Sequence, residues 1–234
     1  MKLSLLDITQ KILSSLDSDP VNSIDDTVES IQVAELIKEA YYSLMAERDW
    51  PFLHELSQLE GLADTANPTK MRIPETVNKI KWVKYNKKEI QWLPAPEFHK
   101  IIMNRTEEAG VVDANGYIIN ADPQYWTSYD DDYVIFDGIN LATETTLHAS
   151  NSSIYAVKAP TWTHSDTFVP DLPDKFFPTL LAEAKSQAFV ELKQTSNARE
   201  EQRARRGRVT MQNEAWRNEF GEYKYNTKVN YGRR

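Results

Sequence analysis

The sequence predicts an α+β fold: a helical bundle with an inserted, mostly antiparallel β domain, followed by an extended basic C-terminal helix and tail. One basis is the hydrophobic period, which is helical near both ends and changes to the two-residue alternation of strands in the middle. The other is charge, because residues 190–234 hold 11 basic and 6 acidic residues in a chain whose net charge is -8. The expected parts are N-terminal helices at 1–52, a β-rich domain at 53–170, C-terminal helices at 171–220 and an extended tail at 221–234.

Two helices are expected before the β-rich domain. The first is short, with apolar residues at helical spacing between Leu5 and Leu16. Ser23–Asp26 is similar to a capping box, so the second helix is expected to begin there and to run for about 25 residues to Pro51. Proline ends it because its nitrogen carries no hydrogen for the helical hydrogen bond. The apolar stripe expected to be buried on this helix is Val28, Ile31, Val33, Leu36, Ile37, Ala40, Tyr41, Leu44 and Met45.

The second helix closes in the segment Arg48-Asp49-Trp50-Pro51-Phe52. Large aromatic side chains contribute much of the packing energy of protein cores. We therefore expect Arg48, Trp50 and Phe52 to be structural residues that close the end of the bundle where it meets the β-rich domain.

Short runs of β-branched and aromatic residues predict the strands of the middle domain. Turn signals such as Asn86-Lys87 and Asn115-Gly116 separate the runs, and one helix is expected to open at Pro94. The expected strands are 71–74, 80–85, 90–93, 117–119, 124–127, 133–136 and 154–157.

The C-terminal part predicts two further helices of different character. The first follows Asp171–Asp174 and carries an apolar stripe that begins with Phe177 and Leu180. The second, Ala198–Phe220, is helical in composition but poor in apolar residues. We expect it not to bury a stripe within its own protomer, and helices of this kind often bridge subunits.

Five arginines of that polar helix are expected to face a neighbouring subunit or DNA. They are Arg199, Arg203, Arg205, Arg206 and Arg208. Such a cluster suits phosphate groups. Glu200, Glu201 and Glu214 interleave with the arginines, so a solvated or inter-subunit face of ion pairs is the alternative.

Several classes of site are not predicted. There is no cysteine, the four histidines lack metal-ligand spacing, and no glycine-rich phosphate motif occurs. No catalytic residue, cofactor or metal is therefore expected. No apolar run approaches the length of a membrane-spanning helix, so no membrane partner is expected either. The 35 carboxylates leave open a tail-associated peptidoglycan or polysaccharide hydrolase, because two of them can act as an acid and a base.

The order of the parts resembles tail tubular protein A, the family of head-to-tail adaptors of short-tailed bacteriophages. The segments that carry the resemblance are the short helix over 12–24, the end Arg48-Asp49-Trp50-Pro51-Phe52 of the long helix, the insert with Asp130–Gly138, and the helix announced by Asp171–Phe177. The arginine, tryptophan and phenylalanine of the second segment are its most specific element. The resemblance covers nearly the whole chain in architecture.

The resemblance implies a structural virion protein without catalytic activity. It would form a homo-oligomeric, dodecameric ring that joins the portal protein to the tail tube or nozzle protein and lines the DNA channel. Genomic DNA would pass through without specific binding, and the protein would be found in the virion tail after assembly in the host cytoplasm. The alternatives are the hydrolase above and a DNA-binding protein that uses Arg199–Arg208.

The last residues alternate in the period of a strand, which predicts a segment that adds to a sheet edge of another protein. With the resemblance, the expected recipient is the portal. The expected portal-binding residues are Tyr223, Lys224, Tyr225, Lys228, Val229 and Tyr231. A disordered solubilising tail is the alternative interpretation.

Overall fold

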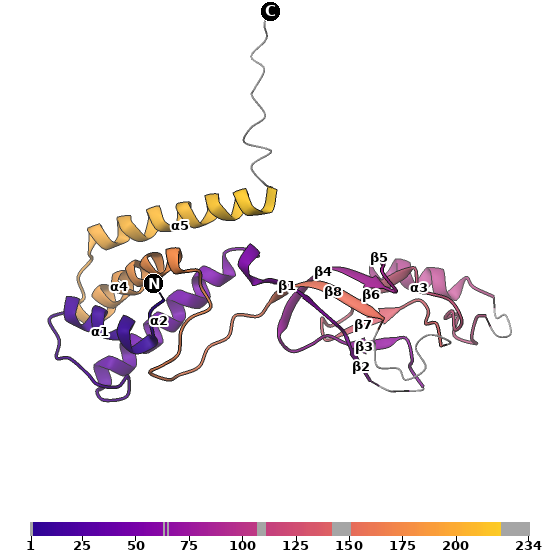
Figure 1. Ribbon diagram of the computed structural model, residues 1–234, viewed down its shortest axis with the longest axis horizontal. Helices are drawn as coiled ribbons and strands as arrows, with labels where there is room; N and C mark the ends of the chain where they lie inside the picture. Colours follow the sequence, from indigo (N-terminus) through magenta and orange to yellow (C-terminus); the bar gives the residue numbers. More distant parts are fainter. Residues whose placement is uncertain (1, 63, 65, 107–110, 142–150, 221–234) are drawn as a thin grey trace, which may run out of the picture. The chain divides into compact units, whose positions relative to one another are not determined.

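The computed structural model of the protein describes residues 2–62, 64, 66–106, 111–141 and 151–220. Within them the fold is mixed, with five α-helices and one eight-stranded sheet (Figure 1). The chain divides into two compact units. The sheet unit is Leu53–Ala159, and the helical unit is formed by Met1–Phe52 together with Pro160–Arg234. No helix in the described residues has both the length and the apolar character needed to cross a membrane.

The helical unit is built in layers. Its helices are α1 (Leu5–Ser15), α2 (Val28–Ala46), α4 (Phe177–Lys193) and α5 (Ala198–Phe220), with short 3₁₀ helices at Pro51–Leu53 and Asp174–Phe176. Helix α4 packs against α1 and α2 on one side and against α5 on the other. Helix α5 is therefore the outer layer of this unit (Figure 1).

The start of α2 differs from the sequence prediction. The helix has 19 residues and begins at Val28, where Thr27 and Ser30 form a capping box. One half of the expected capping box at Ser23 is present, because Asp26 Oδ2 accepts the Ser23 N–H at 2.9 Å, but the same oxygen also accepts the Asn22 N–H at 2.7 Å and no helix continues from this turn. These bonds close a turn ahead of the helix, so the apolar stripe begins later than predicted.

The segment 160–170 also departs from the prediction, which placed it in the β-rich domain. It packs with the helices. The Leu5 N–H donates to the Phe168 carbonyl at 2.7 Å, and the Ile24 N–H donates to Asp166 Oδ1 at 2.8 Å. Trp162 packs against Tyr41, with ring centroids 5.8 Å apart. Burial raises the pKa of Tyr41 to about 12, so its hydroxyl stays neutral in the folded unit.

The sheet unit is mostly antiparallel. Its strands are β1 (His54–Ser57), β2 (Glu60–Gly61), β3 (Lys70–Arg72), β4 (Val77–Tyr85), β5 (Lys88–Trp92), β6 (Tyr125–Thr127), β7 (Tyr133–Phe136) and β8 (Ser152–Lys158), and α3 is Ala95–Met103. The order in the sheet is β1-β8-β4-β5-β6-β7-β3-β2, and the described strand pairs are antiparallel except β5 with β6. The β4–β5 hairpin turns at Asn86 and Lys87, both at positive φ, as two-residue hairpins require.

The sheet has two strands that the sequence analysis missed and lacks, among the described residues, one strand that it predicted. Strands β1 and β2 were not predicted, because His54–Ser57 and Glu60–Gly61 lack a clear apolar alternation. The expected strand at 117–119 is absent from the described residues, where Ile118 forms only isolated bridges with Val112 and Gly138. A Cβ on Gly138 would lie 2.7 Å from that of Ile118, so the glycine allows the two backbones to approach.

Candidate functional site

Helix α5 packs closely on α4 through a stripe of small residues. Ala204, Met211 and Ala215 are buried, and Gly207 lies against the Thr179 side chain of α4 so tightly that a Cβ there would collide with it. The prediction that this helix buries no stripe in its own protomer is therefore wrong. The stripe is narrow because alanine and glycine let the two helix backbones come close, and it leaves most of α5 exposed.

Arg208 has a different role from the one predicted for it. Its guanidinium donates to both carboxylate oxygens of Glu183 on α4, at 2.6 and 3.1 Å, and reaches Glu47 Oε1 at 2.8 Å. A two-pronged contact of this kind fixes orientation as well as charge. Arg208 therefore joins α5 to α4 and to the residue that follows α2, inside the protomer. An ion pair of Glu214 with Lys175, in the 3₁₀ helix before α4, attaches the C-terminal half of α5.

The surface of α5 opposite the buried stripe is basic and partly apolar. Arg205 and Arg206 are exposed there, as are Val209, with 56% of its surface exposed, and Trp216, with 50%. Val209 and Trp216 are seven residues apart and so share one face. We call Arg205, Arg206, Val209 and Trp216 the α5 outer face. Tryptophan and arginine on an exposed surface are the residue types that protein interfaces favour.

The two remaining arginines of the predicted cluster are also exposed. Arg199 lies in the first turn of α5, and Arg203, whose side chain is 61% exposed, lies 3.9 Å from the mostly buried Glu200. A contact at this distance, with the arginine in solvent, holds the guanidinium only weakly. Both side chains therefore remain available to a neighbouring subunit or to DNA.

A second exposed apolar surface lies at the start of α2, where the sequence predicted burial. Val28 is 72% exposed and Ile31 is 40% exposed. Asp25 is exposed in the turn that leads into the helix, where it also contacts His164 Nε2 at 3.0 Å, and Asp19 is exposed earlier in the connection from α1 to α2. We call Val28, Ile31, Asp19 and Asp25 the α2 corner. It lies on the side of the helical unit away from α5, with α4 packed between the two helices (Figure 1). Sequence periodicity missed this surface, because Val28 and Ile31 fit the helical spacing of the core stripe.

The aromatic segment after α2 occupies a structural position. Trp50 is fully buried, and its indole Nε1–H donates to the Leu44 carbonyl at 2.8 Å. Phe52 stacks on Trp50 at 6.0 Å between ring centroids and also approaches Phe176, at 6.1 Å. Arg48 is half-buried beside them. The Trp50 hydrogen bond satisfies one of the carbonyl groups that the end of α2 leaves without a helical partner.

The predicted portal-binding residues lie outside the described residues. They are Tyr223, Lys224, Tyr225, Lys228, Val229 and Tyr231. Within the described part of the chain, no three histidine, aspartate or glutamate side chains gather in a way that could hold a metal ion. A scan against protein-family models finds no model that matches the chain. A search of curated proteins likewise finds no match.

Proposed function

We propose that this protein is the head-to-tail adaptor of a short-tailed bacteriophage, a structural virion protein that forms a ring between the portal and the tail tube. In this proposal the helical unit is the bundle that packs side by side around the DNA channel, and the sheet unit is its insertion. The basis of the identity is the resemblance of the chain to tail tubular protein A. The observation that supports assembly comes from the surfaces of the helical unit.

The helical unit carries two different surfaces, the α5 outer face and the α2 corner, which are opposite in charge and lie on opposite layers of the unit. The α5 outer face carries Val209 and Trp216 with two arginines, whereas the α2 corner carries Val28 and Ile31 with two aspartates. A patch that binds a different patch on the next copy makes a head-to-tail contact, and such contacts close into rings when the rotation between copies allows. Opposite charges around the apolar residues would steer the surfaces together and fix their register.

The charge of the chain fits a channel through which DNA slides. With 27 basic and 35 acidic residues the net charge is -8. Binding of proteins to the DNA backbone depends on neutralising its phosphates, so an acidic ring would hold DNA weakly. In this arrangement Arg205 and Arg206 are used between subunits, which removes them from contact with the genome.

Charge reversal at the two surfaces tests the proposed contact. We expect Arg205→Glu with Arg206→Glu to prevent ring formation on the portal protein, because each arginine would then repel the aspartates of the next copy. A variant that also carries Asp19→Arg and Asp25→Arg should form rings again, since the attraction is restored with its signs exchanged. Analytical ultracentrifugation of each variant mixed with portal protein measures the outcome.

The matched control changes the same amount of charge elsewhere. Lys87→Glu with Lys88→Glu alters two exposed lysines of the β4–β5 turn in the sheet unit and should leave ring formation unchanged. Rings formed by the double arginine variant, or a four-residue exchange that fails to restore them while the protein remains folded, would place the subunit contact elsewhere.

A further inference from the structure

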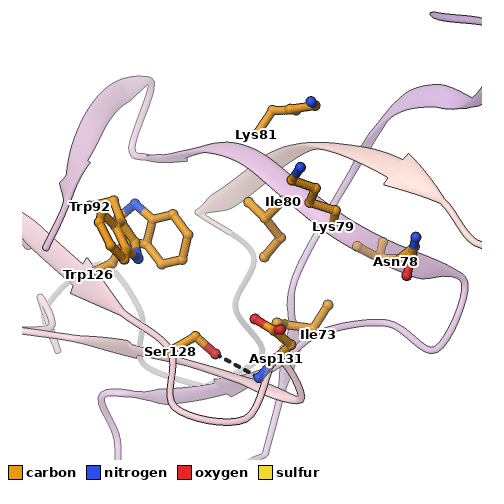
Figure 2. Close-up of a pocket in the computed structure, with 10 residues that line it drawn as sticks. Ile73, Asn78, Lys79, Ile80, Lys81, Trp92, Trp126, Ser128 and Asp131 are labelled. Atoms are coloured by element: carbon orange, nitrogen blue, oxygen red, sulfur yellow. Dashed lines mark hydrogen bonds between the residues drawn. The ribbon is translucent and has the colours of Figure 1, made fainter. Parts of the chain in front are cut away.

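A cleft opens in the sheet unit where β4 and β5 separate. The described pairing of these strands runs from Tyr85 and Lys88 to Val83 and Ile90, and the register of β4 against β8 shifts between Ile80 and Trp82. Beyond that shift a cavity of about 600 Å³ lies beside the strand (Figure 2). Its lining is Ile73, Val77, Asn78, Lys79, Ile80, Lys81, Trp92, Trp126, Ser128 and Asp131.

Tryptophans form one wall of this cleft. Trp92 on β5 and Trp126 on β6 are partners in the parallel register, so both side chains leave the same face of the sheet. Figure 2 shows the two indole rings together on one side of the cavity and Asn78 on the other. Trp92 is 54% exposed, which is unusual for so large an apolar side chain, whereas Trp126 is 6% exposed. The Trp126 indole Nε1 has no hydrogen-bond partner among the described residues.

A neighbouring hollow of about 440 Å³ extends the cleft along the sheet. It shares Lys81, Trp92 and Trp126 with the first cavity and adds Trp82 and Glu89. The two hollows therefore form one groove with an aromatic wall, which we call the tryptophan groove. Open aromatic surfaces of this kind bind ligands with a flat apolar face, such as a sugar ring or a base.

The polar residues of the groove distinguish between these ligands. Lys79 and Lys81 provide two positive charges, and Asp131 and Glu89 provide two negative ones, so the lining carries no net charge. A groove that binds single-stranded nucleic acid is positively charged along the phosphate backbone. Mixed donors and acceptors instead suit hydroxyl groups, which both donate and accept hydrogen bonds. The balance of charge therefore favours a polyhydroxylated ligand.

Asp131 is held in the groove by its turn. This residue lies in the loop between β6 and β7 at φ 59, a left-handed conformation that few side chains adopt. Its backbone N–H donates to Ser128 Oγ at 3.2 Å, as drawn in Figure 2. The turn thus sets a carboxylate and a serine hydroxyl in the same cavity as the two indole rings.

We propose that the tryptophan groove is a binding site for a saccharide. The apolar face of a pyranose ring would stack on Trp92, while its hydroxyls would donate to Asp131 and accept from Lys79 and Lys81. The groove is confined to the sheet unit, so this inference is independent of the contact proposed for the helical unit. The proposal concerns binding of the saccharide and includes no cleavage step.

Titration with soluble oligosaccharides tests the site. The probes are maltohexaose, cellohexaose and chitohexaose, and the readout is the tryptophan fluorescence of the full chain, confirmed by calorimetry. We expect saturable binding of at least one probe with a dissociation constant on the order of 1 mM, typical of shallow and exposed sites. Trp92→Ala should weaken that binding about tenfold or more, which corresponds to a loss of at least about 1.4 kcal/mol of binding free energy.

The matched control is Trp216→Ala, which removes a similarly exposed tryptophan of the helical unit and should leave saccharide binding unchanged. Failure of all three probes to saturate would overturn the proposal, and so would equal binding by the Trp92→Ala variant. Oligothymidylate is the competing probe. Its binding at the groove, lost in the Trp92→Ala variant, would identify a nucleic-acid site and overturn the saccharide assignment.

Discussion

Replacing Trp50 with alanine is expected to lower the free energy of unfolding of the helical unit by about 3–5 kcal/mol. The side chain is fully buried, and it contributes both packing and a hydrogen bond to the Leu44 carbonyl at 2.8 Å. Its removal leaves a cavity next to Phe52 and exposes a helix-end carbonyl that has lost its donor. The substitution therefore removes both the packing of a large side chain and a buried hydrogen bond.

Thermal and urea unfolding of the Trp50→Ala variant measure this effect. Trp216→Ala is the matched control, because it makes the same substitution at a tryptophan that is half exposed, where no buried cavity results. We expect the control to change stability by less than about 0.5 kcal/mol, as for most surface substitutions. A melting temperature close to that of the wild type for Trp50→Ala would show that this aromatic does not hold the end of α2.

The second large effect is expected at Asp137 in the sheet unit. This fully buried carboxylate accepts the backbone N–H groups of Gln124 and Tyr125, at 2.8 and 2.9 Å, and pairs with Arg105 at 2.6 Å. Arg105 also donates to the Asp137 carbonyl at 2.9 Å. The contacts join the turn after α3, the start of β6 and the residue that follows β7. Asp137→Ala would leave the guanidinium and two backbone donors without their acceptor, at a cost of about 3–5 kcal/mol.

An exposed ion pair provides the matched comparison for Asp137. Arg72 and Glu75 lie 2.7 Å apart, close to the Arg105–Asp137 distance, but their side chains are 44% and 83% exposed. Glu75→Gln should therefore cost less than about 1 kcal/mol. Urea unfolding followed by tryptophan fluorescence compares the two variants. Equal losses of stability would mean that burial does not decide the strength of these pairs here.

Local sequence patterns predicted the helices and strands better than they predicted the surfaces. The expected division of the C-terminal part into two helices is confirmed, because Gln194 takes a left-handed conformation that ends α4 before α5 begins at Ala198. The packing of α5 against α4 was not predicted, because alanine and glycine contribute little to a hydrophobic pattern even when they are buried. The start of α2 was placed too early because Ser23–Asp26 offers the same cap chemistry as Thr27 and Ser30.

The candidate sites depend on contacts between distant residues, which a single sequence does not specify. Trp92 and Trp126 are register partners on adjacent strands, yet the first is half exposed and the second is buried. Trp126 is also paired with Phe136 on β7, whereas the described pairing of β5 with β4 ends at Ile90, before Trp92. In the same way, Arg205 and Arg208 belong to one predicted cluster, and the positions of Glu183 and Glu47 in the fold separate their roles.

The central claim, that this chain forms a ring on a portal, is tested most directly by its mass in the presence of that partner. Native mass spectrometry would be applied to the protein alone and to its mixture with the portal protein of the same phage. The adaptor proposal predicts the mass of a single chain, 27.0 kDa, or a weak oligomer when alone, and a closed dodecameric ring on the portal in the mixture. An unchanged mass in the mixture, with no complex at any ratio of the two proteins, would contradict it.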